Sequence, residues 1–211
     1  MSPPPSTVDR APTRRSHEAR KAETRARLLE AAAALLAERG VDGLSVDAVA
    51  TEAGRTSGAV YAHFGSKQGM LLALLDEWRH SLLAVVAAEF ERTAELTDRL
   101  RAVARDVVVN PNEDTRRLMA LERELWRMAG RDRQVARAMR VRAADAQERM
   151  ARGFAAWKQA GLLDEAADPA TIAVAFRAMV VGLEMAQRID PVLDVDQAAA
   201  ALGLVVGATE T

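Results

Sequence analysis

The sequence contains no cysteine and few aromatic residues, and the first of these absences excludes whole classes of site. Without cysteine, disulfide bonds and thiolate metal centres are excluded, which fits a reducing cytoplasm. No apolar run approaches the roughly 18 residues that cross a bilayer, because runs such as residues 82–88 soon meet a charge. The opening stretch MSPPPSTVDRAPTRRS has no apolar core, so we expect no secretory signal and a cytoplasmic location.

Charge is unevenly distributed along the 211 residues, although its net value is only −1. Residues 10–27 contain seven Arg or Lys and two Glu, whereas residues 68–211 contain 19 basic and 22 acidic residues. A basic segment beside a mildly acidic body is typical of proteins that bind a polyanion. The alternative is that arginine is simply abundant in this chain. We expect residues 1–17 to form a disordered basic arm.

Apolar residues recur with helical spacing along nearly the whole chain, which predicts an all-α fold of about nine helices. The pattern over residues 18–39 places Leu28, Ala32, Leu35 and Leu36 on one face and ends at Gly40, a residue that tolerates positive φ. The chain shows no alternating strand pattern and no internal repeat. After a long helix that starts at residue 67, further helices are expected at 96–109, 113–127, 135–159, 170–188 and 195–206.

Two short helices are predicted between residues 45 and 64, joined by a tight turn. Ser45 is a suitable N-cap for the first, and Gly54 ends it. Thr56 or Ser57 caps the second, whose Val60 and Phe64 are four apart and are expected in the core. Two short helices braced by a preceding long one form a helix-turn-helix. The second helix is then expected to face outward with side chains that are small or can form hydrogen bonds: Ser57, Ala59, Tyr61 and His63.

The stretch GRTSGAVYAHFGSKQGM, residues 54–70, resembles the DNA-binding region of the TetR family of bacterial transcriptional regulators. The upstream stretch LLEAAAALLAERGVDGLSVDAVATEAG resembles the first two helices of that family, and the resemblance covers about residues 22–75. Beyond it, only helix lengths and order are similar. Arg55 departs from the pattern, because an apolar residue usually follows the turn glycine. The matching motif positions are Gly54, Thr56, Gly58, Tyr61, His63, Phe64 and Lys67, together with Gly40, Gly43 and Ser45 upstream.

The resemblance implies specific roles in binding duplex DNA. Tyr61, His63 and Lys67 are expected to contact phosphate oxygens. Ser45, at a helix N-terminus, is expected to bind a phosphate as well. The tip of the second short helix would enter the major groove, where Ala59 is suited to touch a thymine methyl group. The predicted DNA-binding set is Lys21, Ser45, Arg55, Thr56, Ser57, Gly58, Ala59, Tyr61, His63 and Lys67.

Each of these roles has an ordinary structural alternative. Taken alone, Tyr61 fits a half-buried aromatic residue with a solvated hydroxyl better than a DNA contact. His63 as a metal ligand is disfavoured, because His17 and His80 lie at no ligand-like spacing from it. We therefore expect no metal and no cofactor.

We expect two domains, a helix-turn-helix domain over residues 18–66 and a ligand-binding and dimerisation domain over residues 67–211. The helices at 170–188 and 195–206 are rich in small residues, and the resemblance implies a homodimer through them; packing within one chain is the alternative. A small-molecule effector is implied as well. Its candidate pocket wall is Trp78, Met119, Trp126, Met150, Phe154, Trp157, Phe176 and Met179. Residues of this kind at helical spacing are more often plain core than pocket wall.

The predicted function is ligand-responsive transcription regulation: a repressor of a palindromic operator that a small molecule releases. An enzyme is not expected, because GRTSG is not a G-x-S-x-G nucleophile elbow and GSKQG lacks the spacing of a phosphate-binding loop. A helical protein–protein adaptor is the remaining alternative. Salt distinguishes the two, because DNA binding weakens steeply with added salt and an apolar interface does not.

Overall fold

The fold is built from helices at the positions where the apolar spacing predicts them. The computed structural model describes residues 14–92 and 95–207, and no strand occurs among them. The chain forms two compact units, residues Met1–Leu74 and Leu75–Thr211. The predicted arm over 1–17 lies outside the described residues up to residue 13, and residues 14–17 form the first turn of helix α1.

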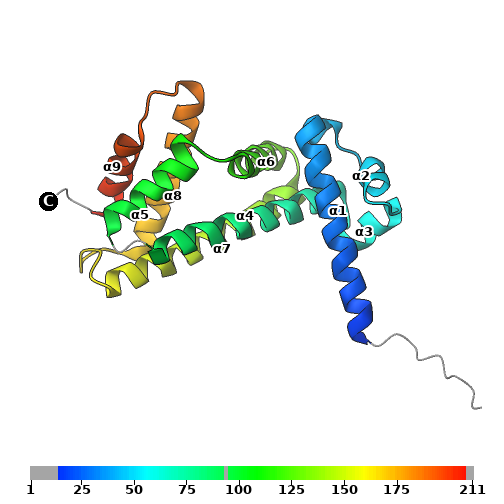
Figure 1. Ribbon diagram of the computed structural model, residues 1–211, viewed down its shortest axis with the longest axis horizontal. Helices are drawn as coiled ribbons and strands as arrows, with labels where there is room; N and C mark the ends of the chain where they lie inside the picture. Colours follow the sequence, from blue (N-terminus) through cyan, green and yellow to red (C-terminus); the bar gives the residue numbers. More distant parts are fainter. Residues whose placement is uncertain (1–13, 93–94, 208–211) are drawn as a thin grey trace, which may run out of the picture. The chain divides into compact units, whose positions relative to one another are not determined.

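The N-terminal unit consists of α1 (Arg14–Gly43), α2 (Val46–Glu52), α3 (Ser57–Phe64) and the first turns of α4 (Lys67–Arg92). Gly40 has φ +67°, so the regular part of α1 ends where the sequence predicted, and one further turn follows the kink. The short helices α2 and α3 lie on one side of the C-terminal half of α1 (Figure 1).

A small apolar core holds this unit together. The predicted stripe of α1 is buried, and Val49 of α2, Val60 of α3 and Met70 of α4 are each 0% exposed. Phe64 differs from expectation, because it is only half-buried and its ring faces the guanidinium of Arg25 at 5.7 Å. Helices this short are marginal in isolation, so the shared core is what keeps α2 and α3 folded.

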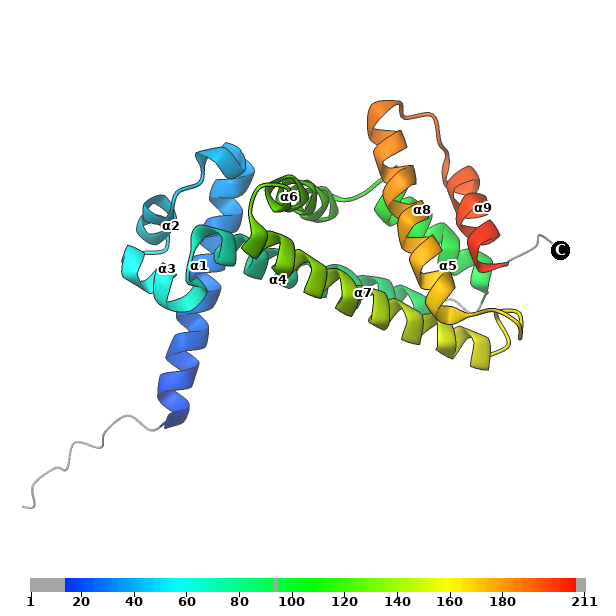
Figure 2. The ribbon, with the colours of Figure 1, turned by 180° about the vertical axis from the view of Figure 1, so that it is seen from behind.

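The C-terminal unit begins at Leu75, within α4. It continues with α5 (Leu96–Val103), a π-helical segment η1 (Ala104–Val109), α6 (Glu113–Ala129), α7 (Arg133–Gln159), α8 (Pro169–Ile189) and α9 (Val195–Val206). Most helices in this unit begin at an Asn or Asp side chain that accepts backbone N–H bonds; the caps are Asn112, Asp132, Asp168 and Asp194. Helices α8 and α9 form an antiparallel hairpin (Figure 2).

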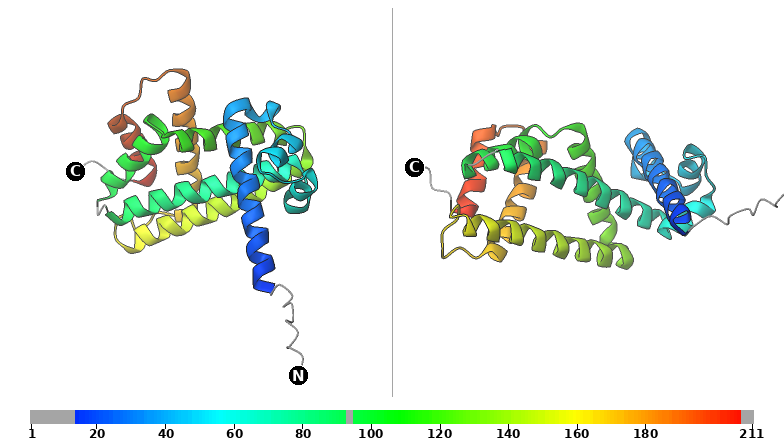
Figure 3. Two further views of the ribbon diagram at one scale, coloured as in Figure 1. Left: turned by 45° about the vertical axis from the view of Figure 1, so that its right-hand side comes forward. Right: turned by 60° about the horizontal axis from the view of Figure 1, so that its bottom comes forward.

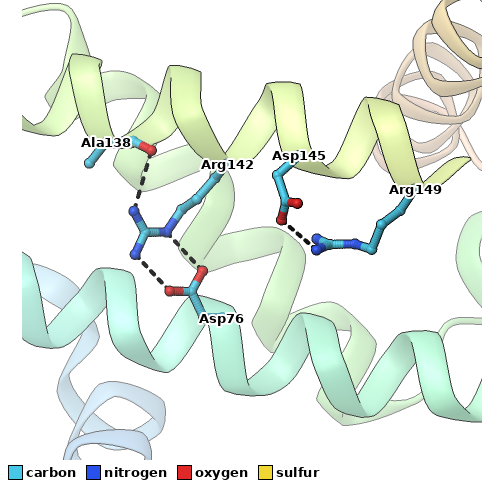
Figure 4. Close-up of polar contacts among 5 residues, drawn as sticks. All are labelled: Asp76, Ala138, Arg142, Asp145 and Arg149. Carbon is cyan, nitrogen blue, oxygen red and sulfur yellow. Dashed lines mark hydrogen bonds and ion pairs between the residues drawn. The ribbon is translucent and has the colours of Figure 1, made fainter.

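Arginine–carboxylate pairs connect the helices of this unit. Arg142 of α7 donates two hydrogen bonds to Asp76 of α4, at 2.8 and 2.6 Å (Figure 4). Arg79 of α4 pairs with Glu122 of α6. Bidentate arginine–carboxylate contacts fix orientation as well as distance, so α7 is held in register against α4.

A further pair lies deeper in the same unit. Arg123 of α6 donates to Glu184 of α8 at 2.7 Å, and Glu184 is only 8% exposed. A carboxylate that is this buried is stable only when it is paired, so the contact sets how α8 lies against α6.

Candidate nucleic-acid interface

The turn between α2 and α3 is built by side-chain caps at both helix starts. The hydroxyl of Ser45 accepts a hydrogen bond from the N–H of Ala48 at 3.1 Å, and that of Thr56 accepts from Ala59 at 3.3 Å. Gly54, with φ +61°, makes the sharp turn that no L-residue adopts easily. The geometry is that of a helix-turn-helix, with Thr56 as the N-cap of the second helix.

Of the side chains predicted to face outward from α3, Tyr61 is exposed, whereas Ser57, Ala59 and His63 are half-buried. Tyr61 is 54% exposed, and Gly58 is exposed as well. The hydroxyl of Ser57 donates to the carboxylate of Asp47 in the first turn of α2. Both views in Figure 3 show α2 and α3 packed close to each other, as this contact requires. Tyr61 is therefore not the half-buried aromatic residue of the alternative interpretation.

Cationic side chains gather near His63 at the end of α3. Its pKa lies below the ordinary imidazole value, because the ring is partly buried and because Lys21 and Arg25 of α1 are close. Lys21 is exposed, and Arg55 is exposed at the turn. Lys21, Arg25 and Arg55 are all cationic, so positive charge lies beside α3, where an anion would be attracted.

Lys67 has a second contact that the sequence does not reveal. Its ammonium group donates to the backbone carbonyl of Val41 at 2.8 Å, and the side chain is half-buried. This bond joins the start of α4 to the segment that follows the kink in α1. An ammonium group has three N–H donors, so the bond to Val41 leaves others for a phosphate.

Sequence reasoning missed two residues of this interface. Asp47 was not singled out, although an acidic residue in the first turn of a helix is a recognisable signal. Arg25 was not singled out either, although it follows Lys21 by four residues and so lies on the same face of α1. Both act through contacts between helices, which local patterns do not specify.

The predicted pocket residues lie mainly in the core of the C-terminal unit. Phe154 and Phe176 are buried, with ring centroids 5.3 Å apart in an edge-on arrangement. Met119, Met150, Trp157 and Met179 pack against the same cluster as partly buried residues, and Trp78 is half-buried. Trp126 is different, because it is 44% exposed and lines a surface depression. A role in effector binding for any of them stays a prediction.

The outer faces of α8 and α9 expose apolar side chains. Val174, Val181, Met185 and Ile189 are between 38% and 79% exposed, at spacings of seven, four and four along α8. Leu204 of α9 is 81% exposed. Such spacings place the α8 residues on one continuous face.

Comparison with known proteins places these features in a family. A sequence model described as "Bacterial regulatory proteins, tetR family" matches residues 28–74. The transcriptional repressor KstR2 of Mycobacterium tuberculosis is 39% identical over 79 residues, which are 37% of this chain and 40% of KstR2. The chain spans less than half the length of the curated relatives it matches, between 28% and 45% of the first two.

Solved structures resemble nearly the whole chain. A TetR-family regulator from a Rhodococcus species superposes with a TM-score of 0.72 at 24% identity, covering 90% of this chain and all of the other. A regulator from Saccharomonospora viridis, solved in complex with choline, superposes with a TM-score of 0.65 at 20% identity, covering 88% and 96%. At these identities the similarity establishes the fold.

Proposed function

Because the chain belongs to the TetR family of bacterial transcriptional regulators, we propose that it binds duplex DNA as a homodimer and represses transcription. A small molecule bound to the C-terminal unit would release it from its operator. The family consists of regulators, so no catalytic activity is proposed. A protein that acts on bacterial DNA works in the cytoplasm.

The observation that carries the proposal is the arrangement of the N-terminal unit. Its short helix α3 is capped by Thr56, is anchored by the fully buried Val60, and exposes Tyr61 on the other side. Lys21 and Arg55 add positive charge around it. A rigid helix tip with cations beside it can enter the major groove while the cations contact phosphates.

Homodimerisation is supported by the apolar outer face of α8. By length and hydropathy α8 is the one helix, within the part of the chain described, that could cross a membrane. Two polar residues of α8 bond within the unit, because Glu184 pairs with Arg123 and Gln187 bonds the backbone of Leu193. Monomers rarely expose a continuous apolar stripe, so we assign this face to a second copy of the chain.

DNA binding is tested by selecting fragments of the source genome with the purified protein and measuring their affinity in shift assays. We expect affinity to fall steeply with salt, with a log–log slope of about −0.9 for each phosphate neutralised. The double variant Tyr61→Phe, Lys67→Ala should weaken binding about tenfold or more, or about 1.4 kcal/mol. Arg137→Ala is the matched control, because it removes an exposed charge from α7. Salt-independent binding, or a double variant as tight as the parent, would favour the adaptor interpretation.

Dimerisation is tested by placing a charge on the α8 face. Val181→Glu should give a monomer in sedimentation at micromolar concentration, because a carboxylate would be desolvated in the interface. Val141→Glu is the control, because Val141 is 63% exposed on α7 and outside that face. A Val181→Glu protein that remains a dimer would refute the assignment.

Release by a small molecule requires a ligand that prefers the state with weak DNA affinity. A ligand shifts such an equilibrium only by its difference in affinity for the two states. Titration of a confirmed ligand into the protein–operator complex should therefore lower operator affinity. A ligand that strengthens operator binding would make the protein a corepressor-dependent regulator instead.

A further inference from the structure

A surface depression of about 350 Å³ lies where α6, α7 and α8 meet in the C-terminal unit. Its volume falls within the range of small-molecule sites, which starts near about 300 Å³. Most of its lining is apolar, from Trp126, Met139 and alanines of α6 and α7. The polar exceptions are Arg140 and Arg177.

The two arginines are not neutralised by carboxylates. Neither Arg140 nor Arg177 forms an ion pair within the described residues, whereas six other arginines on the same three helices do: Arg117, Arg123, Arg127, Arg142, Arg149 and Arg152. The carboxylates of the three surrounding helices are engaged elsewhere. On α6, Glu113 and Asp114 pair with Arg117, Glu122 with Arg79, and Glu124 with Arg127. On α7, Asp145 pairs with Arg149 and Glu148 with Arg152, and on α8 Glu184 pairs with Arg123. Among the described residues, no carboxylate therefore pairs with the two positive charges at the depression.

An aromatic surface lies beside these charges. Trp126 is 44% exposed, and the guanidinium of Arg177 lies 5.9 Å from the centroid of its ring. Met139, which is 7% exposed, belongs to the apolar lining. A half-exposed tryptophan ring offers a large apolar contact area, and methionine adapts to ligands of different shape. The site thus offers an apolar surface next to two cations.

We propose that this depression binds an amphipathic organic anion, with a carboxylate held by Arg140 and Arg177 and an apolar body lying on Trp126 and Met139. Guanidinium groups recognise planar carboxylates through paired hydrogen bonds. An organic cation would be repelled, and inorganic phosphate would leave the apolar surface unused. The inference names the chemical class of the effector. Its consequence for regulation rests on the proposed function, but binding of the anion does not depend on that function.

The test uses the full-length protein without DNA and isothermal calorimetry with benzoate, 2-naphthoate and dodecanoate. At least one should bind with a Kd below about 1 mM, and the corresponding neutral amide should bind at least tenfold more weakly, as should inorganic phosphate. Arg140→Ala and Arg177→Ala should each weaken binding about tenfold, because each removes a charge-assisted hydrogen bond. Trp126→Ala should weaken it as well, whereas Arg137→Ala should not.

Each result decides the inference independently of DNA binding. Absence of binding by all three carboxylates, equal binding of acid and amide, or full binding by the Arg140→Ala, Arg177→Ala double variant would refute it. The same holds if that double variant changes the oligomeric state without ligand, because the depression would then be covered by a second copy. Normal carboxylate binding by a protein that selects no DNA fragment would support the site and refute the proposed function instead.

Discussion

The hydroxyl of Ser57, the first residue of α3, donates its proton to the carboxylate of Asp47 in the first turn of α2. A hydroxyl that already donates its one hydrogen can only accept a hydrogen bond from another partner. Within the proposed interface, Ser57 is then an acceptor, suited to the amino groups of adenine or cytosine in the major groove. It does not suit the acceptor atoms of guanine.

Asp47→Ala should therefore broaden the base preference at the position that Ser57 contacts, because the freed hydroxyl can donate as well as accept. Selection and sequencing of bound DNA measures this preference. Glu52→Ala is the control, since it removes a negative charge from the same helix without touching Ser57. Both variants should bind DNA more tightly at low salt, but only Asp47→Ala should alter the selected sequence. An unaltered sequence preference in Asp47→Ala would show that Ser57 reads no base.

Gly58 and Gly69 should respond in opposite ways to alanine. A Cβ atom at Gly58 would meet only the Thr56 hydroxyl at 3.6 Å, an ordinary contact. Gly58→Ala should therefore raise the free energy of unfolding by about 0.5 kcal/mol, because alanine favours the helix. Its DNA affinity should still fall, by about tenfold, if α3 approaches the groove as closely as proposed.

At Gly69 a Cβ atom would lie 2.0 Å from the carbonyl oxygen of Phe64, which belongs to the backbone and cannot turn aside. Gly69→Ala should lower the free energy of unfolding by about 2 kcal/mol or more. Thermal and urea denaturation measure both variants. Equal stability of the two would contradict the close packing of α3 against α4.

Lys67 is expected to contribute to folding stability, and Lys21 to DNA binding. Lys67→Met removes the hydrogen bond to the Val41 carbonyl and should lower the free energy of unfolding by about 1–2 kcal/mol. Lys21→Met, at an exposed position, should leave stability unchanged. It should instead reduce the salt slope of DNA binding by about 0.9, the value for one lost phosphate contact. Denaturation and salt titration distinguish the two roles, and identical behaviour of the two variants would show that the bond to Val41 adds no stability.

His63 should couple DNA binding to pH. Partial burial and the neighbouring Lys21 and Arg25 hold its pKa below the ordinary imidazole value in the free protein. A nearby phosphate would favour the charged form, so binding should take up a proton and DNA affinity should rise as pH falls from about 7 to about 5.5. His63→Gln should remove this dependence, while His80→Gln should keep it.

The same lowered pKa has the opposite effect on folding. The unfolded chain takes up a proton at His63 before the folded chain does, so this residue reduces stability as pH falls below the ordinary imidazole pKa. When the pH is lowered across that range, the free energy of unfolding of His63→Gln should fall less than that of the parent protein. Equal losses would place the responsible group elsewhere.

Much of the fold could be predicted because its signals are local. The apolar stripe around Leu28 and Leu35, the cap at Ser45 and the turn at Gly54 each depend on neighbours within a few residues, and all are confirmed. The start of α1 at Arg14, four residues before the predicted start, and the π-helical geometry of residues 104–109 were not predicted.

The order and type of the helices follow from local sequence patterns, because helical periodicity and caps act over one or two turns of chain. Three further features depend on how the helices pack: Ser57 donates its proton to Asp47, Lys67 donates to the Val41 carbonyl, and Arg140 and Arg177 have no carboxylate partner among the described residues. These relationships join residues on different helices, and their partners are selected by packing, which no local pattern encodes.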